Sequence, residues 1–203
     1  MYRKPTIVAM DLEGVLVPEI WIAVAEKTGI EKLRLTTRDV ADYDELMRMR
    51  LRILEERGIR LKDIQAVINS IEPLPGAVDF LKWLRERTQA VILSDTYYEF
   101  AHPLMRKLGW PSLFCNTLEV DENNTIINYH LRIRDGKRKA TIAFKEIGFR
   151  VVAIGDSYND TTMLKEADVG LLFRPPLNVV EEFPKFRVFK EYEEMKAFLK
   201  EHL

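Results

Sequence analysis

The stretch Thr6-Ile7-Val8-Ala9-Met10-Asp11-Leu12-Glu13-Gly14-Val15-Leu16-Val17 joins a short apolar run to two closely spaced carboxylates. Residues 7–10 are typical of a buried parallel strand, and the run ends abruptly at Asp11. Open α/β sheets bind their ligands at the carboxyl ends of such strands. If residues 12–14 stay extended, Asp11 and Glu13 point the same way, because side chains alternate along a strand. A divalent cation, or a nucleophile beside an acid/base, would explain the pair; a solvated acidic loop is the alternative.

The composition limits the class of protein. The chain has 203 residues, 47% hydrophobic and 31% charged, which predicts one domain with an insertion or two small domains. A formal net charge of −1 gives no reason to expect nucleic acid or an anionic membrane as a partner. The apolar runs are too short for a membrane helix, and the N-terminus lacks a signal-peptide core. The single cysteine, Cys115, excludes a disulfide within the chain and favours a cytoplasmic protein, and the scattered histidines give no zinc pattern.

Helical patterns dominate residues 18–72. Helices are expected at residues 19–29, 43–57 and 61–71, and glycines follow or end the first two. A loop and cap are expected at residues 36–39, and no segment of this region reads as a good strand. We therefore expect a small helical cap at residues 18–72, inserted after the first strand and ended by the turn residues of 73–76.

The remainder of the chain alternates strands with helices. Apolar strand runs are expected at residues 90–93, 151–154 and 169–173, and a β-hairpin at residues 115–120 and 125–132. Helices are expected at residues 77–87, 98–108, 137–147, 161–167, 175–183 and 192–202, the first with Val78, Leu81 and Leu84 on one face. This alternation predicts a doubly wound parallel α/β sheet, built from residues 1–17 and 73–203.

Polar side chains follow three of the apolar runs, and a lysine begins a helix between the last two: Asp11 with Glu13, Ser94, Lys137, and Asp156 with Asp160. This set fits phosphoryl transfer. Asp11 is the candidate nucleophile, and Mg²⁺ would be held by Asp11, Asp156 and the backbone carbonyl of Glu13. Ser94 and Lys137 would bind the phosphoryl oxygens. Singly, each has a plainer explanation, such as a helix cap for Ser94 or a solvated surface position for Lys137.

The motif order carries a resemblance to a known family. D-x-[DE]-G-V, then S-D after a strand, then a lysine, then G-D-S-x-N-D resembles the haloacid dehalogenase superfamily of phosphohydrolases, and the motifs span Asp11 to Asp160. A helical insertion after the first motif is similar to the phosphoserine phosphatase branch. The segments D-L-E-G-V-L-V-P-E-I-W and G-D-S-Y-N-D-T-T-M-L further resemble its bifunctional phosphoserine phosphatase/homoserine phosphotransferase subgroup.

The resemblance implies an Mg²⁺-dependent phosphatase that acts on L-phosphoserine through an aspartyl phosphate, with a homodimer left open. It implies these roles: Asp11 as nucleophile, Glu13 as general acid/base, a metal site at Asp11, Glu13 and Asp156, phosphate contacts from Ser94, Asp95 and Lys137, support from Asn159 and Asp160, and substrate recognition by Glu19 and Arg50. Phosphoserine carries an ammonium and a carboxylate, which suit Glu19 and Arg50. The alternative for Arg50 is a solvated face of its arginine-rich helix, with Arg48 and Arg52 nearby.

Glu13 departs from the pattern, because most of the superfamily has Asp there. Its carboxyl is one methylene longer and would approach the leaving oxygen at a different angle. Slow hydrolysis of the aspartyl phosphate would leave time for another acceptor, most plausibly L-homoserine. Three alternatives stand beside this hypothesis: a relative acting on another small phosphomonoester, a phospho-accepting receiver domain, and an inactive relative that only binds phosphorylated ligands.

Overall fold

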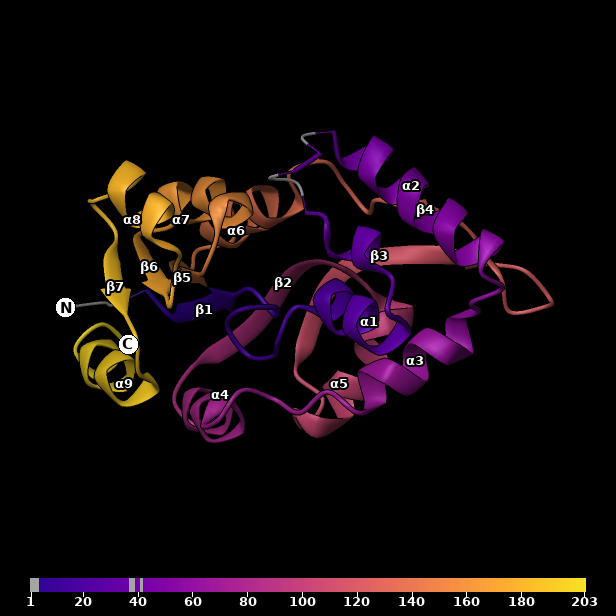
Figure 1. Ribbon diagram of the computed structural model, residues 1–203. Coiled ribbons are helices and arrows are strands. Elements are labelled where there is room, and N and C mark those ends of the chain that lie inside the picture. The colour runs from indigo at the N-terminus through magenta and orange to yellow at the C-terminus, as the bar shows by residue number, and fades with distance from the viewer. Residues whose placement is uncertain (1–3, 37–38, 41) are drawn as a thin grey trace.

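The computed structural model describes residues 4–36, 39–40 and 42–203, and one sheet of seven strands organises them. The strands lie in the order β4-β3-β2-β1-β5-β6-β7, as Figure 1 shows. Among these strands the β3–β4 pair is antiparallel and the other neighbouring pairs are parallel. The bounds are β1 (Thr6–Met10), β2 (Gln89–Tyr97), β3 (Ser112–Val120), β4 (Ile126–His130), β5 (Arg150–Gly155), β6 (Val169–Phe173) and β7 (Arg187–Phe189). The predicted doubly wound α/β fold is confirmed.

Helices cover both faces of the sheet (Figure 1). One face carries α6 (Gly136–Glu146), α7 (Thr161–Glu166) and α8 (Leu177–Glu182), and the other carries α4 (Ala77–Arg85), α5 (Tyr98–Lys107) and α9 (Tyr192–Lys200). Strand β1 lies at the centre, so Val8 and Met10 join one apolar cluster while Ile7 and Ala9 join the other. Burial on both faces is why this strand is apolar throughout instead of alternating.

Residues 18–72, which we call the helical insertion, lie between β1 and α4 in the chain. They form α1 (Ile20–Thr28), the 3₁₀ turn η1 (Glu31–Arg34), α2 (Tyr43–Glu56) and α3 (Leu61–Asn69). The three predicted helices are confirmed, and no strand occurs in the part of this region that the structure describes. The loop expected at residues 36–39 includes 37 and 38, which lie outside the described residues.

Three details differ from the sequence-based expectations. Val78 is 43% exposed, because the buried face of α4 is formed by Ala77, Phe80, Leu81 and Leu84. Strand β2 does not end at residue 93 but continues through Ser94 to Tyr97, with a register shift against β3. Strand β7 was not expected, since three residues are too short to show a period, and pairing with β6 creates it.

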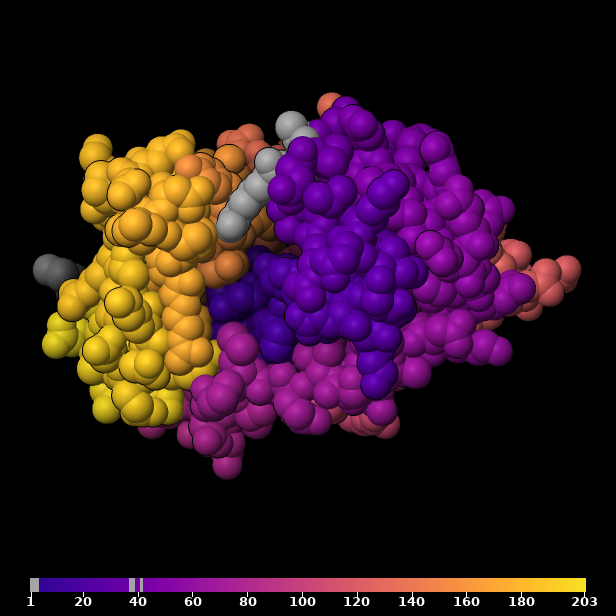
Figure 2. All heavy atoms as spheres, viewed as in Figure 1, coloured from indigo at the N-terminus to yellow at the C-terminus, as the bar shows by residue number. Residues whose placement is uncertain are grey.

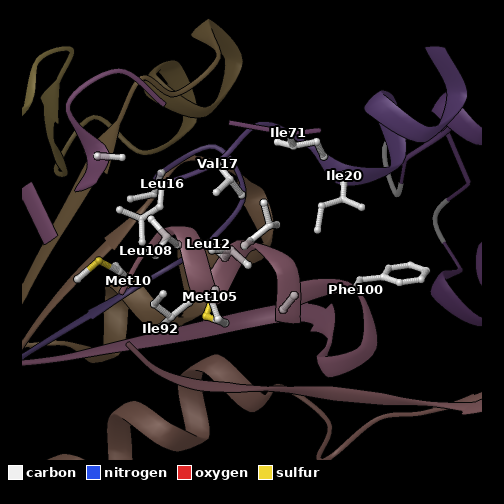
Figure 3. Packing of buried hydrophobic residues seen from close by; sticks show 14 of the residues in the cluster. Met10, Leu12, Leu16, Val17, Ile20, Ile71, Ile92, Phe100, Met105 and Leu108 are labelled. Carbon is white, nitrogen blue, oxygen red and sulfur yellow. The ribbon is translucent and has the colours of Figure 1, made fainter. Parts of the chain in front are cut away.

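Apolar side chains of the loop after β1 pack into the core and anchor the loop. In Figure 3, Leu12 and Leu16 lie among Met10, Met105 and Leu108 in one buried cluster. Backbone N–H groups of Leu16 and Val17 both donate to the carbonyl of Leu12, at 2.8 and 3.0 Å, which closes a tight turn. The turn fixes the backbone between Asp11 and the helical insertion.

The predicted hairpin of β3 and β4 is confirmed, and its turn contacts the start of α3. The N–H of Leu61 donates to the carbonyl of Asn124 at 3.0 Å, and the N–H of Lys62 donates to Asn124 Oδ1 at 2.7 Å. The guanidinium of Arg60 donates to the carbonyl of Asn123 at 2.9 Å. The hairpin therefore caps a helix of the insertion from outside.

Candidate active site

A cavity of about 360 Å³ lies between the carboxyl ends of the central strands and the helical insertion. The space-filling view in Figure 2 shows the molecule hollowed between the insertion and the orange C-terminal part. Predicted site residues lining the cavity are Asp11, Glu13, Glu19, Arg50, Ser94, Asp95, Lys137 and Asn159. Asp156 and Asp160 are not among the lining residues, but their carboxylates cluster with that of Asp11. We call these three side chains the carboxylate group. The fold thus brings all ten predicted residues into one region.

Lys137 is the centre of the ionic contacts. Its Nζ lies 2.8 Å from Asp11 Oδ2, 2.8 Å from Asp160 Oδ1 and 3.5 Å from Asp95 Oδ2, and its side chain is 3% exposed. Burial alone lowers the pKa of Lys137, but the facing carboxylates of Asp11 and Asp160 outweigh it and hold the pKa well above its usual value. The plainer explanation, a solvated surface lysine, is therefore wrong.

Carboxylate oxygens of Asp11, Asp156 and Asp160 lie within 4.8 Å of one another. Burial, followed by the charge of Asp160, raises the pKa of Asp11 well above its usual value and that of Asp156 to about 7. The ammonium of Lys137 contacts two of these three carboxylates, those of Asp11 and Asp160, so the three together carry surplus negative charge when ionised. Hard oxygen donors with surplus negative charge fit a divalent cation.

Asp160 supports this group through both of its oxygens. Oδ1 accepts from Lys137, while Oδ2 accepts from the N–H of Asp156 at 2.9 Å and of Ser157 at 3.2 Å. Its Cβ would lie only 2.3 Å from a Cβ placed on Gly155, so a residue larger than glycine would force the loop apart. The loop of the G-D-S-x-N-D motif is therefore held by hydrogen bonds among its own residues, which fix the position of Asp156 near Asp11.

Glu13 directs its carboxylate toward α1. Its Oε2 accepts from the N–H of Ile20 at 2.7 Å, which takes the place of a cap because Glu19 makes no side-chain cap bond. Burial first, and the neighbouring Glu19 second, raise the pKa of Glu13 to about 8. A raised pKa suits a carboxyl that acts as a general acid. Its carboxylate does not belong to the cluster of Asp11, Asp156 and Asp160, and the expected metal contacts of Glu13, through its side chain or its backbone carbonyl, stay a prediction.

Arg50 is buried, with 5% of its surface exposed, although it belongs to an arginine-rich helix. Its Nη2 donates to the carbonyl of Leu35 at 2.7 Å, and its Nε has no hydrogen-bond partner among the described residues. Arg48, in contrast, has a side chain that is 70% exposed. The solvated-face explanation for Arg50 is therefore wrong, and Arg50 is a buried cation that lines the cavity.

The remaining predicted residues lie on the opposite wall. Ser94 Oγ accepts from the N–H of Thr96 at 3.2 Å, which leaves its hydroxyl proton available. Asn159 Nδ2 donates to Asp95 Oδ2 at 3.1 Å, so the last part of β2 and the 3₁₀ turn after β5 (Tyr158–Asp160) are joined beside Lys137. These contacts fix the polar side chains of Ser94, Asp95 and Asn159 beside the carboxylate group.

An aromatic and basic part of the cavity was not predicted from the sequence. Trp21, Arg34, Tyr43 and Tyr97 line it, and the hydroxyls of Tyr43 and Tyr97 are 2.7 Å apart. The latter two join the helical insertion to the sheet, because Tyr43 begins α2 and Tyr97 ends β2. Of these four residues, only Trp21 could have been suspected from the sequence, because it lies two residues after the predicted site residue Glu19.

Residues 5–168 match the family model of the haloacid dehalogenase-like hydrolases, and the chain belongs to this family. It is 60% identical over 190 residues to the phosphoserine phosphatase of Pseudomonas syringae, covering 94% of this chain and 80% of that protein. It is also 60% identical over 195 residues to the phosphoserine phosphatase ThrH of Pseudomonas aeruginosa, covering 96% and 95% of the two chains. The resemblance stated from the motifs is thereby confirmed.

Solved structures share the fold. One described as a phospho-aspartyl intermediate analogue of phosphoserine phosphatase superposes with a TM-score of 0.76 at 20% identity, covering 97% of this chain and 99% of that one. Within the described part of the chain, no helix is both long and apolar enough to cross a membrane.

Proposed function

We propose that the chain is an Mg²⁺-dependent phosphoserine phosphatase that releases serine and phosphate through an aspartyl phosphate on Asp11. The observation that carries the proposal is one cavity that Asp11 and Lys137 line from the sheet and its helices and Arg50 lines from the helical insertion. Relatives at 60% identity bear the name phosphoserine phosphatase, which supports the choice of substrate.

In the first step a carboxylate oxygen of Asp11 forms a bond to phosphorus while the bond from phosphorus to the serine oxygen breaks. Glu13 gives its proton to that departing oxygen, which suits a carboxyl whose pKa is about 8. In the second step a water gives its proton to Glu13 and attacks phosphorus, which releases phosphate and restores Asp11.

Asp11 and Asp156 are the residues that would hold Mg²⁺, and Asp160 would support them. When bound, the ion would neutralise charge on the phosphoryl oxygens and keep the carboxylates ionised. Lys137 and the hydroxyl of Ser94 would bind those same oxygens, with Asp95 and Asn159 holding the surrounding loops together.

Recognition of the amino acid would fall to the helical insertion. Arg50 would bind the substrate's carboxylate and Glu19, which lines the cavity at the start of α1, would bind its ammonium. We infer that residues 18–72 act as a cap over the site. The two connections to the rest of the chain lie together, since the N–H of Leu74 donates to the carbonyl of Leu16 at 2.9 Å. Closure over the bound substrate would exclude bulk water while the phosphoryl group passes to Asp11.

A second activity, transfer of the phosphoryl group to L-homoserine, is favoured by the contact of Glu13 with α1. The longer side chain reaches the N–H of Ile20, which an aspartate at this position would not reach without a backbone shift. Glu13 is thereby tied to the helix that would hold the acceptor's ammonium. Incubation with phosphoserine, homoserine and Mg²⁺ should yield phosphohomoserine by mass spectrometry, beside free phosphate. Free phosphate alone at every homoserine concentration would leave a plain phosphatase.

The proposed substrate is tested by phosphate release from phosphoamino acids, sugar phosphates and nucleotides with Mg²⁺. We expect phosphoserine to give the highest kcat/KM. A sugar phosphate or nucleotide above it would replace phosphoserine with another small phosphomonoester and leave the chemistry at Asp11 in place.

A further inference from the structure

Trp21 and Arg50 come from different helices and meet at the wall of the cavity. The guanidinium carbon of Arg50, on α2, lies 4.4 Å from the centroid of the Trp21 ring, on α1. Phe100 of α5 contacts the same ring edge-on, with centroids 5.5 Å apart and planes at 73°. The indole is therefore held from the core side by one aromatic ring and presents its face to the cation.

The hydrogen bonds of Arg50 leave its Nε–H unpaired among the described residues. Nη2 donates to the carbonyl of Leu35 at 2.7 Å, and Nη1 faces the sulfur of Met47 at 3.7 Å. Nε is buried and has no partner within the described part of the chain. An unpaired buried N–H is unfavourable, and more so on a charged group, unless a ligand satisfies it.

A guanidinium held by one carbonyl could still turn about that bond. Stacking on a flat ring removes this freedom, because the attraction is greatest when the cation lies over the ring face. The ring face of Trp21 and the carbonyl of Leu35 therefore hold the guanidinium from two sides, at the wall of the cavity that Arg50 lines.

We propose that Trp21 is a positioning residue that fixes the guanidinium of Arg50 so that it selects phosphomonoesters bearing a carboxylate. This deepens the proposed function and rests on it. Trp21 acts through Arg50. It increases the preference of the enzyme for a carboxylate-bearing substrate over the same molecule without the carboxylate. Its loss should weaken selection and leave the phosphoryl chemistry of Asp11 in place.

Phosphoserine and phosphoethanolamine form a matched pair of substrates, because they differ only in the carboxylate. The readout is the ratio of their kcat/KM values, in which effects common to both substrates cancel. Trp21→Leu should lower this ratio about tenfold, through KM for phosphoserine, since a desolvated cation–π contact is worth about that factor. Trp21→Phe retains a ring face and should restore part of the ratio.

Trp83→Leu is the matched control. Trp83 is also partly buried against the core and has a guanidinium over its ring, that of Arg87 at 4.8 Å, but it lies on α4 and does not line the cavity. It loses the same kind of contact and should keep the wild-type ratio. Thermal melting of each variant shows whether it is folded.

The outcomes separate the two proposals. A wild-type enzyme that does not prefer phosphoserine overturns the proposed function, and this inference with it. A wild-type preference that Trp21→Leu and Trp21→Phe leave unchanged overturns the inference alone. Equal losses on both substrates in the two variants would make Trp21 a packing residue. A lower ratio in Trp21→Leu, partly restored in Trp21→Phe and unchanged in Trp83→Leu, supports it.

Discussion

Gly14 shows how a single residue determines the geometry of the carboxylate group. Its φ is +75°, and a Cβ there would lie 2.4 Å from the carboxyl carbon of Asp156. Gly14→Ala should therefore strain the backbone and displace the Asp156 carboxylate from Asp11. We expect at least tenfold weaker Mg²⁺ activation, equivalent to about 1.4 kcal/mol, measured as the Mg²⁺ concentration for half-maximal phosphate release.

Gly29→Ala is the control for this prediction. Gly29 has a similar φ of +67° at the end of α1, but nothing lies within 4 Å of a Cβ there. It should lose a comparable amount of stability to backbone strain alone and keep its Mg²⁺ dependence. If both variants respond to Mg²⁺ equally, the close approach of Gly14 to Asp156 does not shape the metal site.

Arg50 carries a separate prediction at the residue scale. Arg50→Ala should reduce the phosphoserine to phosphoethanolamine ratio of kcat/KM by more than tenfold, because a charged hydrogen bond is worth about 1.5–3 kcal/mol. Parallel kinetics on the two substrates provide the measurement. Equal losses on both would mean that Arg50 is structural.

The residues at strand ends could be predicted, and the contacts between helices could not. Asp11, Lys137 and Asp160 follow from where apolar runs stop and from the order of motifs. The burial of Arg50 depends on Trp21 and on the Leu35 carbonyl, which come from α1 and from the segment after η1. The helical period does place Arg50 on one stripe with Leu46 and Leu54, away from Arg48. It does not reveal what packs against that stripe, so the partners of Arg50 could not be predicted.

At the scale of elements, the hairpin supports the helical insertion through Asn124. This residue has a φ of 65° and its side chain caps the N–H of Lys62. Asn124→Ala should lower the free energy of unfolding by about 1–3 kcal/mol, since it loses the cap and strains the backbone. Asn124→Gly loses only the cap and should cost less. Thermal melting compares the two, and an equal loss would contradict a strain contribution.

Element boundaries differed from expectation where pairing overrides local pattern. Polar residues 94–96 ended the apolar run, yet β2 continues through them because neighbouring β3 extends alongside, with a register shift. Strand β7 has three residues and exists through its pairing with β6. Long helices such as α2 were placed within a residue or two, because 14 residues show the helical period clearly.

At the scale of the whole molecule, we expect the cluster of Asp11, Asp156 and Asp160 to couple the stability of the fold to pH and to Mg²⁺. The pKa of Asp156 is about 7 in the fold, raised by burial and Asp160, against about 4 in the unfolded chain. Between these values the folded state holds more protons, so without metal its free energy of unfolding falls as pH rises from about 4 to about 7. Mg²⁺ favours the ionised carboxylates and should raise the melting temperature more at about pH 8 than at about pH 5.

Asp156→Asn provides the check on this prediction. It removes the titrating group, so the pH dependence of the metal-free melting temperature should become shallower and the Mg²⁺ effect should disappear. An Mg²⁺ effect of unchanged size in this variant would place the ion elsewhere.

The measurement that tests the account most directly is phosphate release from phosphoserine by the wild type and by Asp11→Asn, with and without Mg²⁺. Asparagine keeps the shape of the side chain but lacks the anionic oxygen that would bond to phosphorus. We predict release by the wild type with Mg²⁺, none above background by Asp11→Asn, and a folded variant by circular dichroism. Phosphate release by Asp11→Asn at a rate near that of the wild type would contradict Asp11 as the nucleophile.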